Sequence, residues 1–444
     1  MSGPAVVELD RLIDQGPWST LQKRVLALAA LAFALDGLAN QALGLALPAL
    51  IRDWNRPREA FASVAALGLI GVALGTVLGG VAGDRAGRRA GLIGSVLFFA
   101  LMTAAMARAR DLEALLMLRF FSGMGIGGAI PNGAALISEF TPARRRSLAI
   151  ALGMLFIPVG GVLAGLLGAL VLPRWGWRAL FALCGALPLV VGFAFLIGLP
   201  ESPRFLVRLS RRRPQLHALL ERCGLTVAAG SEIRDNAATR DAPLRMLLGA
   251  EQRGATLALW TGFFFCLLAT YTLFSWVPTM LMGQGFGLAL TSLGLTFFNI
   301  GGMSGGVLCG WLIGRLGSRV PGVGLALAAT IGALVLGGLP FDPHTAGVAC
   351  VALLVEGVFL GGLHNALYTV AAVIYPPAVR ATGVGAAAGV GRIGAVLSSY
   401  TGVLTLKVFG ATGYFIVVAI ALALACLGTA CVRSQIPRDA GLTA

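Results

Sequence analysis

Charged residues are scarce in this chain of 444 residues. Asp, Glu, Lys and Arg make up 12% of it, whereas hydrophobic residues make up 57%. Soluble globular proteins carry about 25% charged residues, because their surface must be covered by groups that water solvates. So low a share excludes an ordinary soluble protein and directs attention to the length and spacing of the apolar runs.

Histidine is rare, and cysteine lacks the spacing that metal binding requires. The three histidines, His217, His344 and His364, lie far apart, and the seven cysteines show no metal-ligand pattern. All cysteines except Cys223 fall within apolar runs, where Cys packs as a small hydrophobic side chain. The sequence therefore predicts no metal site, no catalytic residues and no enzyme activity, and it predicts that no cofactor is needed.

Long apolar runs are what the chain has in abundance. A bilayer core of about 30 Å needs about 20 helical residues at 1.5 Å each. Twelve runs meet this requirement, which predicts an all-α membrane protein of two pseudo-symmetric six-helix bundles. We place the helices at 25–50, 61–83, 90–108, 113–138, 147–172, 177–199, 255–282, 291–313, 320–339, 346–374, 382–406 and 412–432.

The runs divide the chain into five parts. A tail (1–24) precedes the first bundle (25–199), a polar central loop (200–254) separates it from the second bundle (255–432), and a short tail (433–444) follows. The Arg-rich stretch from Arg208 to Arg222 predicts an amphipathic helix on the membrane surface. The alternative for this stretch is a plain linker.

Basic residues outnumber acidic ones by 34 to 19, but their placement argues against a nucleic-acid partner. With the first tail inside the cell, 24 of the 34 lie in inner segments and eight in outer loops. The remaining two, Arg119 and Arg392, lie well inside helices rather than at their ends. This is the asymmetry of the positive-inside rule, which places both tails in the cytoplasm. A multi-pass protein of a bacterial inner membrane, in contact with the lipid bilayer and monomeric, is expected.

A short charged motif occurs twice, six predicted helices apart. The first copy, between the second and third helices, reads GVAGDRAGRR and ends at Arg89. The second copy reads GWLIGRLGSR and ends at Arg319; it keeps glycines and the last arginine but lacks the aspartate. Two copies in the same register indicate an internal duplication, as in transporters built from repeats.

Twelve helices, this motif and the central loop resemble the major facilitator superfamily. Two signatures carry the match: Asp84-Arg85-x-Gly87-Arg88-Arg89, and RFFSGMG beginning at Arg119. Within the superfamily the chain resembles the aromatic acid:proton symporter family. The segments that carry this finer match are LDGLANQALGLALPAL (35–50), GMGIGGAIPNGAALISEF (123–140), YTLFSWVPTML (271–281) and VRATGVGAAAGVGRIGAV (379–396).

Rare charges at mid-depth in the helices are the candidates for proton coupling. Asp36 lies about 16 Å into the first helix, where an ionised carboxylate must be paired or protonated. Arg119, always charged, needs an anion, and Asp36 is the nearest by depth. The resembling family has a second acid where this chain has Asn40. Coupling therefore rests on Asp36 alone, uses Glu356, or is lost; a purely structural Asp36–Arg119 pair is the alternative.

Arg392 is the candidate for holding the carboxylate of a substrate, because a guanidinium fork binds carboxylate through two hydrogen bonds. The resembling family has an arginine in the same helix. A permanent pair with Glu356 is the alternative role. Polar and aromatic residues within apolar runs predict the rest of the cavity, although each one singly has a structural alternative. They are Asn40, Gln41, Asn132, Tyr271, Trp276, Asn299, His364, Asn365 and Tyr368.

The first motif copy predicts an inner gate, which we define as Asp84, Arg85, Arg88 and Glu139. Asp84 is expected to meet the start of the eleventh helix, and Arg85 or Arg88 to meet Glu139. The gate would hold the outward-open state; topogenic charge alone is the alternative. Together with the resemblance, these residues predict alternating-access import of a small organic, aromatic carboxylate with protons, driven by the proton gradient. The alternative is a proton-coupled exporter of drugs or hydrophobic metabolites.

Overall fold

The computed structural model describes residues 6–225, 232–234, 247–249, 252–375 and 379–432. The expected tail at 433–444, the first five residues and parts of the central loop lie outside these ranges. In the described part, ten helical segments are long and apolar enough to cross a membrane. The predicted all-α fold is confirmed.

Two of the ten segments are too long for one crossing. They run over Ala143–Gly198 and Thr382–Cys431, which are 56 and 50 residues. At 1.5 Å per residue each exceeds a bilayer core of about 30 Å by more than twofold. Both reverse direction at a glycine with positive φ, Gly176 (71°) and Gly410 (66°), a conformation that glycine adopts without steric cost. The ten segments therefore make the twelve predicted crossings.

The crossings form two halves with matching internal packing. In both halves the second crossing packs on the fourth, α3 on α5 and α11 on α13. The N-terminal half contains α2 (Thr20–Trp54), η1 (Arg58–Phe61), α3 (Ala62–Ala86), α4 (Arg88–Met106), α5 (Leu112–Phe140), α6 (Ala143–Met154) and α7 (Phe156–Gly198). The C-terminal half contains α10 (Arg253–Gly283), α11 (Leu288–Leu316), α12 (Arg319–Gly338), η4 (Pro343–Thr345), α13 (Ala346–Ile374) and α14 (Arg380–Cys431).

One crossing is made of two helices. The fifth helix, predicted at 147–172, is divided at Leu155 into α6 and α7. Pro158 is the physical reason, since it offers no N–H to the carbonyl of Met154 and its ring clashes with that carbonyl.

Short elements form a small unit at one end of the bundle, which we call the terminal unit. It consists of β1 (Val6–Glu8), α1 (Leu9–Gln15), α8 (Pro203–Arg208), η2 (Ser210–Arg212), α9 (Arg213–Arg222) and β2 (Glu232–Arg234). Strands β1 and β2 pair in parallel, and Arg204 Nη2 lies 2.6 Å from Asp10 Oδ1. Asp14 Oδ1 accepts a hydrogen bond from the Ala143 N–H at the start of α6 (2.7 Å). The chain's first residues are thus tied both to the central loop and to the N-terminal half.

The terminal unit changes the interpretation of the Arg-rich stretch. The stretch does contain a helix, α9, but its apolar side chains Leu216, Leu219 and Leu220 are buried inside the protein. A helix lying on lipid must keep its apolar face free of protein. The structure therefore shows a packed protein element where the sequence predicts a membrane-surface helix.

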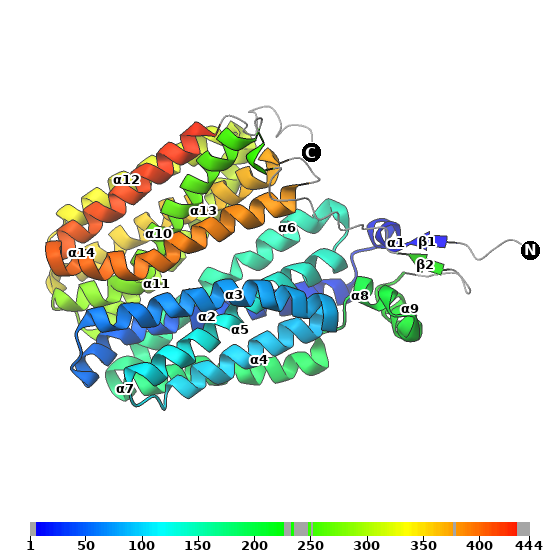
Figure 1. Ribbon diagram of the computed structural model, residues 1–444, viewed down its shortest axis with the longest axis horizontal. Helices are drawn as coiled ribbons and strands as arrows, with labels where there is room; N and C mark the ends of the chain where they lie inside the picture. Colours follow the sequence, from blue (N-terminus) through cyan, green and yellow to red (C-terminus); the bar gives the residue numbers. More distant parts are fainter. Residues whose placement is uncertain (1–5, 226–231, 235–246, 250–251, 376–378, 433–444) are drawn as a thin grey trace, which may run out of the picture.

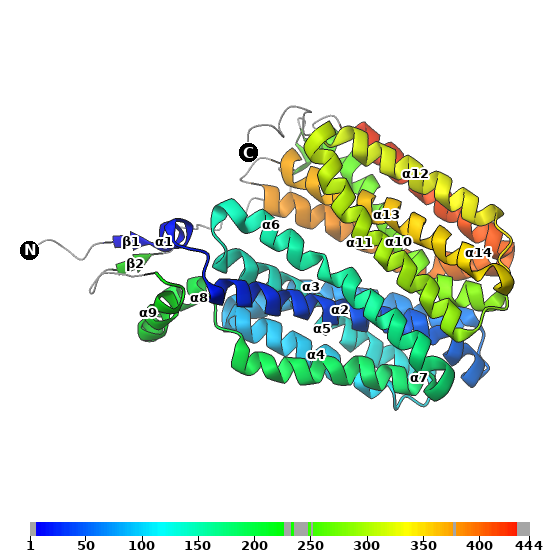
Figure 2. The same ribbon diagram turned by 180° about the vertical axis from the view of Figure 1, so that it is seen from behind.

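The two halves lie side by side and are joined toward one end. Figures 1 and 2 show the terminal unit at one end of the molecule, which we call the α9 end, beyond the N-terminal half. At the opposite, far end, Lys407 Nζ lies 3.2 Å from Glu59 Oε1, and the Tyr400 hydroxyl lies 3.5 Å from Ser63 Oγ. Between described residues, no hydrogen bond or ion pair joins the halves at the α9 end. Among the described residues, the polar contacts between the halves thus lie at the far end and at mid-depth, where Gln41 of α2 bonds Asn299 of α11.

Candidate functional site

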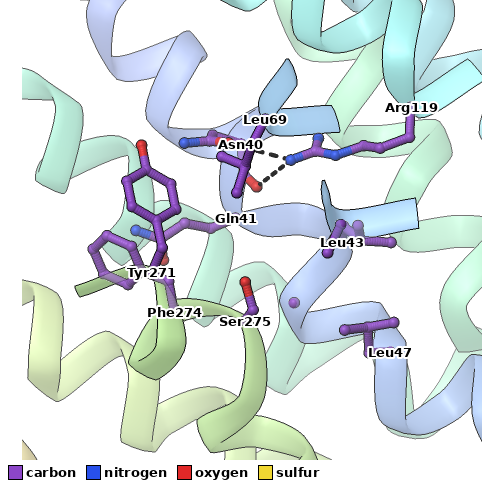
Figure 3. Close-up of a pocket in the computed structure, with 11 residues that line it drawn as sticks. Asn40, Gln41, Leu43, Leu47, Leu69, Arg119, Tyr271, Phe274 and Ser275 are labelled. Atoms are coloured by element: carbon purple, nitrogen blue, oxygen red, sulfur yellow. Dashed lines mark hydrogen bonds between the residues drawn. The ribbon is translucent and has the colours of Figure 1, made fainter. Parts of the chain in front are cut away.

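A pocket lies between the halves at mid-depth, with walls from α2, α3, α5 and α10. Figure 3 shows Arg119 entering from one side and Tyr271 and Phe274 standing on the other. The lining residues are Asn40, Gln41, Leu43, Gly44, Leu47, Ala65, Leu69, Arg119, Tyr271, Phe274 and Ser275. Four of the predicted site residues, Asn40, Gln41, Arg119 and Tyr271, therefore share one cavity.

Arg119 is buried, with 4% of its surface exposed, and it is held by neutral oxygens. Its Nη1 donates to the Ala39 carbonyl (3.3 Å), and its Nη2 donates to the carbonyl (3.0 Å) and the side-chain Oδ1 (3.2 Å) of Asn40. Asn40 thus supplies amide and carbonyl oxygens where the resembling family has a carboxylate. The guanidinium is hydrogen-bonded, yet its charge is not neutralised by any group that it contacts.

Asp36, one turn of α2 before Asn40, is buried with 2% exposure. Its Oδ1 has no hydrogen-bond partner among the described residues, and the charges of Arg392 and Arg119 both act on the carboxylate. One carboxylate thus lies in the field of two arginines, one from each half. A direct Asp36–Arg119 bond is not formed in this conformation of the described chain.

Gln41 joins the two halves directly. Its Nε2 donates to Asn299 Oδ1 (2.8 Å), and Asn299 Nδ2 donates back to Gln41 Oε1 (2.9 Å). Both side chains are buried, and a reciprocal pair satisfies the amides that burial would otherwise leave unpaired. Gly161 of α7 lies against this pair so closely that a Cβ there would meet Asn299 Oδ1 at 2.5 Å. The pair therefore sits at a junction of α2, α7 and α11.

Aromatic residues and Arg392 gather on the C-terminal side of the cavity. The Tyr368 ring packs edge-on against Phe263, with centroids 4.9 Å apart, and lies 5.2 Å from His364. Tyr368 is nevertheless 38% exposed, so it borders open space. The charge of Arg392 acts on His364, Tyr368 and Asp36. Arg392 therefore lies within electrostatic reach of Asp36 across the boundary between the halves.

Glu356 lies elsewhere in the C-terminal half. It is 1% exposed, neither carboxylate oxygen has a partner in the described part of the chain, and it faces Gly332 of α12. The permanent Glu356–Arg392 pair, which the sequence left open as an alternative, is not formed among the described residues.

Three predicted site residues have local structural contacts instead. Asn132 donates to the carbonyls of Gly79 (2.8 Å) and Gly128 (2.9 Å), inside the N-terminal half. Asn365 donates to the Gly306 carbonyl (2.7 Å) between α13 and α11, and Trp276 is fully buried against Gly402 of α14. The structure does not bring these side chains to the pocket.

The residues of the predicted inner gate lie at the α9 end. Arg88 forms an ion pair with Asp84 and lies 3.7 Å from Glu139 Oε1, and Glu139 accepts a hydrogen bond from Ser202. Arg85 is exposed. All these contacts remain within the N-terminal half and its loop; residues 376–378, before the eleventh crossing, lie outside the described residues.

Sequence reasoning missed Ser275 and Phe274. Both follow Tyr271 on α10 at spacings of three and four, which place side chains on one helix face. That spacing, applied to the predicted Tyr271, would have found them. Within the described part of the chain, no group of three or more His, Cys, Asp or Glu is placed to hold a metal ion.

Comparisons with known proteins agree with this geometry. The sequence model of the Major Facilitator Superfamily matches residues 29–399. The gallate transporter of Pseudomonas putida is 33% identical over 90% of this chain and 88% of its own length. The 4-hydroxybenzoate transporter PcaK of Pseudomonas aeruginosa is 33% identical over 91% of each chain. The xylose transporter XylE of E. coli, partially occluded and inward-open, superposes with TM-score 0.73 at 17% identity, over 94% of this chain and 99% of its own.

Proposed function

The chain belongs to the Major Facilitator Superfamily and is a multi-pass membrane transporter, not an enzyme; on this premise we propose that it imports a small aromatic carboxylate together with protons. The relatives reported above are named for gallate and 4-hydroxybenzoate, which are such acids. Similarity in sequence supports the substrate class, and the buried charges between the halves support the coupling.

The observation that carries the proposal is the position of Asp36 and Arg392 on opposite sides of one boundary. The charge of Arg392 acts on Asp36 although the two belong to different halves. A substrate carboxylate can be held by the Arg392 guanidinium through two parallel hydrogen bonds. The partly exposed Tyr368 offers its ring to the substrate, and the buried Phe263 packs edge-on against that ring, a geometry that aromatic pairs prefer.

Asp36 is the proposed proton site. When a substrate anion takes the Arg392 charge, Asp36 loses part of its electrostatic stabilisation and gains affinity for a proton. The substrate anion compensates the charge of Arg392 and so leaves the Asp36 carboxylate uncompensated. Because a proton neutralises that carboxylate, proton and anion enter the buried site together. In this scheme Arg119, held by Asn40, remains a fixed cation near Asp36 when the site is empty.

Alternating access follows from the two sets of contacts. We assign the α9 end to the cytoplasm of a bacterium, because the positive-inside rule places Arg-rich segments there and the relatives are bacterial. The structure is then the inward-open state, held by the far-end contacts Glu59–Lys407 and Tyr400–Ser63. The inner gate would form the matching contacts in the outward-open state. The exporter alternative is not favoured, because a buried arginine suits anions and the relatives reported are named for acids.

The test is uptake by purified protein in proteoliposomes. A panel of labelled aromatic acids is offered under an imposed inward proton gradient, with and without a protonophore. Accumulation of one acid that the protonophore abolishes supports proton-coupled import. Absence of uptake of every acid, together with proton-driven efflux of a lipophilic cation, contradicts it.

A further inference from the structure

Ser275 on α10 differs from the two threonines that precede it on the same helix. Thr270 and Thr272, on the same helix, donate to the carbonyls of Cys266 (2.8 Å) and Leu268 (2.7 Å) four residues earlier. This back-bonding is the usual way in which a hydroxyl within a helix is satisfied. Ser275 makes no such bond among the described residues, and its side chain is only partly buried. Figure 3 shows its oxygen pointing into the pocket.

Two further polar groups reach the same pocket. Asn40 gives its Oδ1 to Arg119, which leaves the two N–H groups of its Nδ2 as donors. Tyr271 stands across the pocket with its ring edge-on to Phe274, at a centroid distance of 6.0 Å, and its hydroxyl has no hydrogen bond among the described residues. The pocket thus offers donors and acceptors that no group in the described part of the chain uses.

The remaining walls are apolar. Leu43, Leu47 and Leu69 line the side facing Tyr271. Tyr368, whose ring packs against Phe263 of α10, lies in the electrostatic field of both Tyr271 and Arg392. In the proposed binding mode the substrate carboxylate lies on Arg392 and the opposite edge of its ring lies toward Ser275.

We propose that Ser275, with Asn40 and Tyr271, forms a subsite that recognises a hydroxyl on the aromatic ring of the substrate, on the edge opposite its carboxylate. This inference rests on the proposed function and deepens it. A phenolic hydroxyl donates to Ser275 Oγ and accepts from Asn40 Nδ2 or the Tyr271 hydroxyl. An acid without that hydroxyl leaves polar groups of the pocket desolvated and unpaired, which disfavours its binding.

Three size-matched acids test the subsite in the unaltered, full-length protein in proteoliposomes. Benzoate, 4-methylbenzoate and 4-hydroxybenzoate are compared by kcat/KM for uptake under the same inward proton gradient. The 4-hydroxy acid is expected to exceed both others by about three- to tenfold, the range of one or two neutral hydrogen bonds. The 4-methyl acid fills the same space without hydrogen bonding, so it separates recognition of a hydroxyl from mere filling of the pocket.

Variants assign the effect to Ser275. In Ser275→Ala the preference for the 4-hydroxy acid over the 4-methyl acid is expected to fall toward one, and Ser275→Thr, which keeps a hydroxyl, retains it. Thr272→Val is the matched control, because it removes a hydroxyl from the same helix that is already bonded to Leu268. Its preference should equal that of the unaltered protein.

The outcomes separate this subsite from the proposed function. Equal kcat/KM for the three acids, or a preference that survives Ser275→Ala, overturns the subsite while uptake of aromatic acids still stands. No uptake of any of the three acids by the unaltered protein overturns both.

Discussion

In the N-terminal half α3 and α5 approach through glycines, and in the C-terminal half α11 and α13 approach in the same way. A Cβ added at Gly71 would collide with the Phe120 backbone, and one added at Gly301 would collide with the Leu354 backbone. Glycines at spacings of four let helix backbones come this close within a membrane. The two halves therefore share the same helix packing, including the close backbone contacts between their second and fourth crossings.

The charged residues of the two halves are not paired in the same way. In the N-terminal half Arg88 pairs with Asp84, and Arg119 is held by three oxygens. At the second copy of the motif Arg315 lies over the Trp311 ring, 4.3 Å from its centroid, where no aspartate is present. Arg392 makes no hydrogen bond or ion pair among the described residues. The comparison teaches that duplication preserved the packing, while charge pairing diverged and left an unpaired cation on the C-terminal side.

The first test, which has the largest expected effect, disrupts the helix packing that the two halves share. Gly75→Val and Gly305→Val each push a side chain into an opposing backbone, at Met124 and Val358. Both should lower stability by roughly 1–3 kcal/mol or more, the cost of overpacking. Thermal unfolding of the detergent-purified protein measures the loss.

The glycine controls come from the same helices. Gly80 and Gly310 have open space where a Cβ would stand, so Gly80→Val and Gly310→Val should leave the unfolding temperature nearly unchanged. Similar losses of stability in Gly75→Val and Gly305→Val support a helix packing shared by both halves. A loss of stability in one half alone contradicts it.

The second test concerns the unpaired cation. Arg392→Ala should weaken binding of an aromatic acid about ten- to hundredfold, since hydrogen bonds to charged groups contribute about 1.5–3 kcal/mol. Isothermal titration calorimetry measures the affinity, and size-exclusion chromatography checks folding. Arg110→Ala, at an exposed loop position near α5, is the control. Unchanged affinity in Arg392→Ala would remove its assigned role.

The third test concerns the one carboxylate between the two arginines. Asp36→Asn should abolish proton-driven accumulation while counterflow exchange continues, because the amide accepts no proton. With a gradient of about one pH unit, coupling to one proton supports about tenfold accumulation, which the variant loses. Full accumulation by the variant would transfer coupling to another group, Glu356 being the buried carboxyl that remains.

The smallest effect is expected at the far-end contact between the halves. Glu59→Gln removes the charge that pairs with Lys407, and these side chains are partly exposed. Such pairs contribute about 0.2–1 kcal/mol, so the population open at the α9 end should fall by up to about fivefold relative to the population closed there. Double electron–electron resonance between labels on the two halves measures the shift, which should shrink at high salt. No shift at low salt would show that this pair does not hold the state.

The sequence predicted the fold well because hydrophobic length determines crossings and glycine permits the sharp turns between them. The predicted gap between 172 and 177 contains Gly176, and the gap between 406 and 412 contains Gly410. The buried face of α9 could not be predicted, since an amphipathic pattern does not say whether lipid or protein covers it.

Counting residues from the ends of the predicted helices assigns a depth to Asp36, Arg119, Glu356 and Arg392. It does not give the direction in which each side chain points around its helix. Glu356 turns to α12, and Asn132 turns into its own half. The Gln41–Asn299 pair joins residues 258 positions apart, and only tertiary packing brings them together.

The parallel pairing of β1 with β2 has a consequence for the order in which the chain is made. Ribosomes deliver residues at about 5–20 per second, the N-terminal domain first. The strand at Val6–Glu8 finds its partner at Glu232–Arg234, before α10 begins at Arg253. All six crossings of the first half, and the acid that caps α6, are therefore complete when that pairing closes. The nascent protein can thus finish and fasten one half in the membrane before the translocon receives the next.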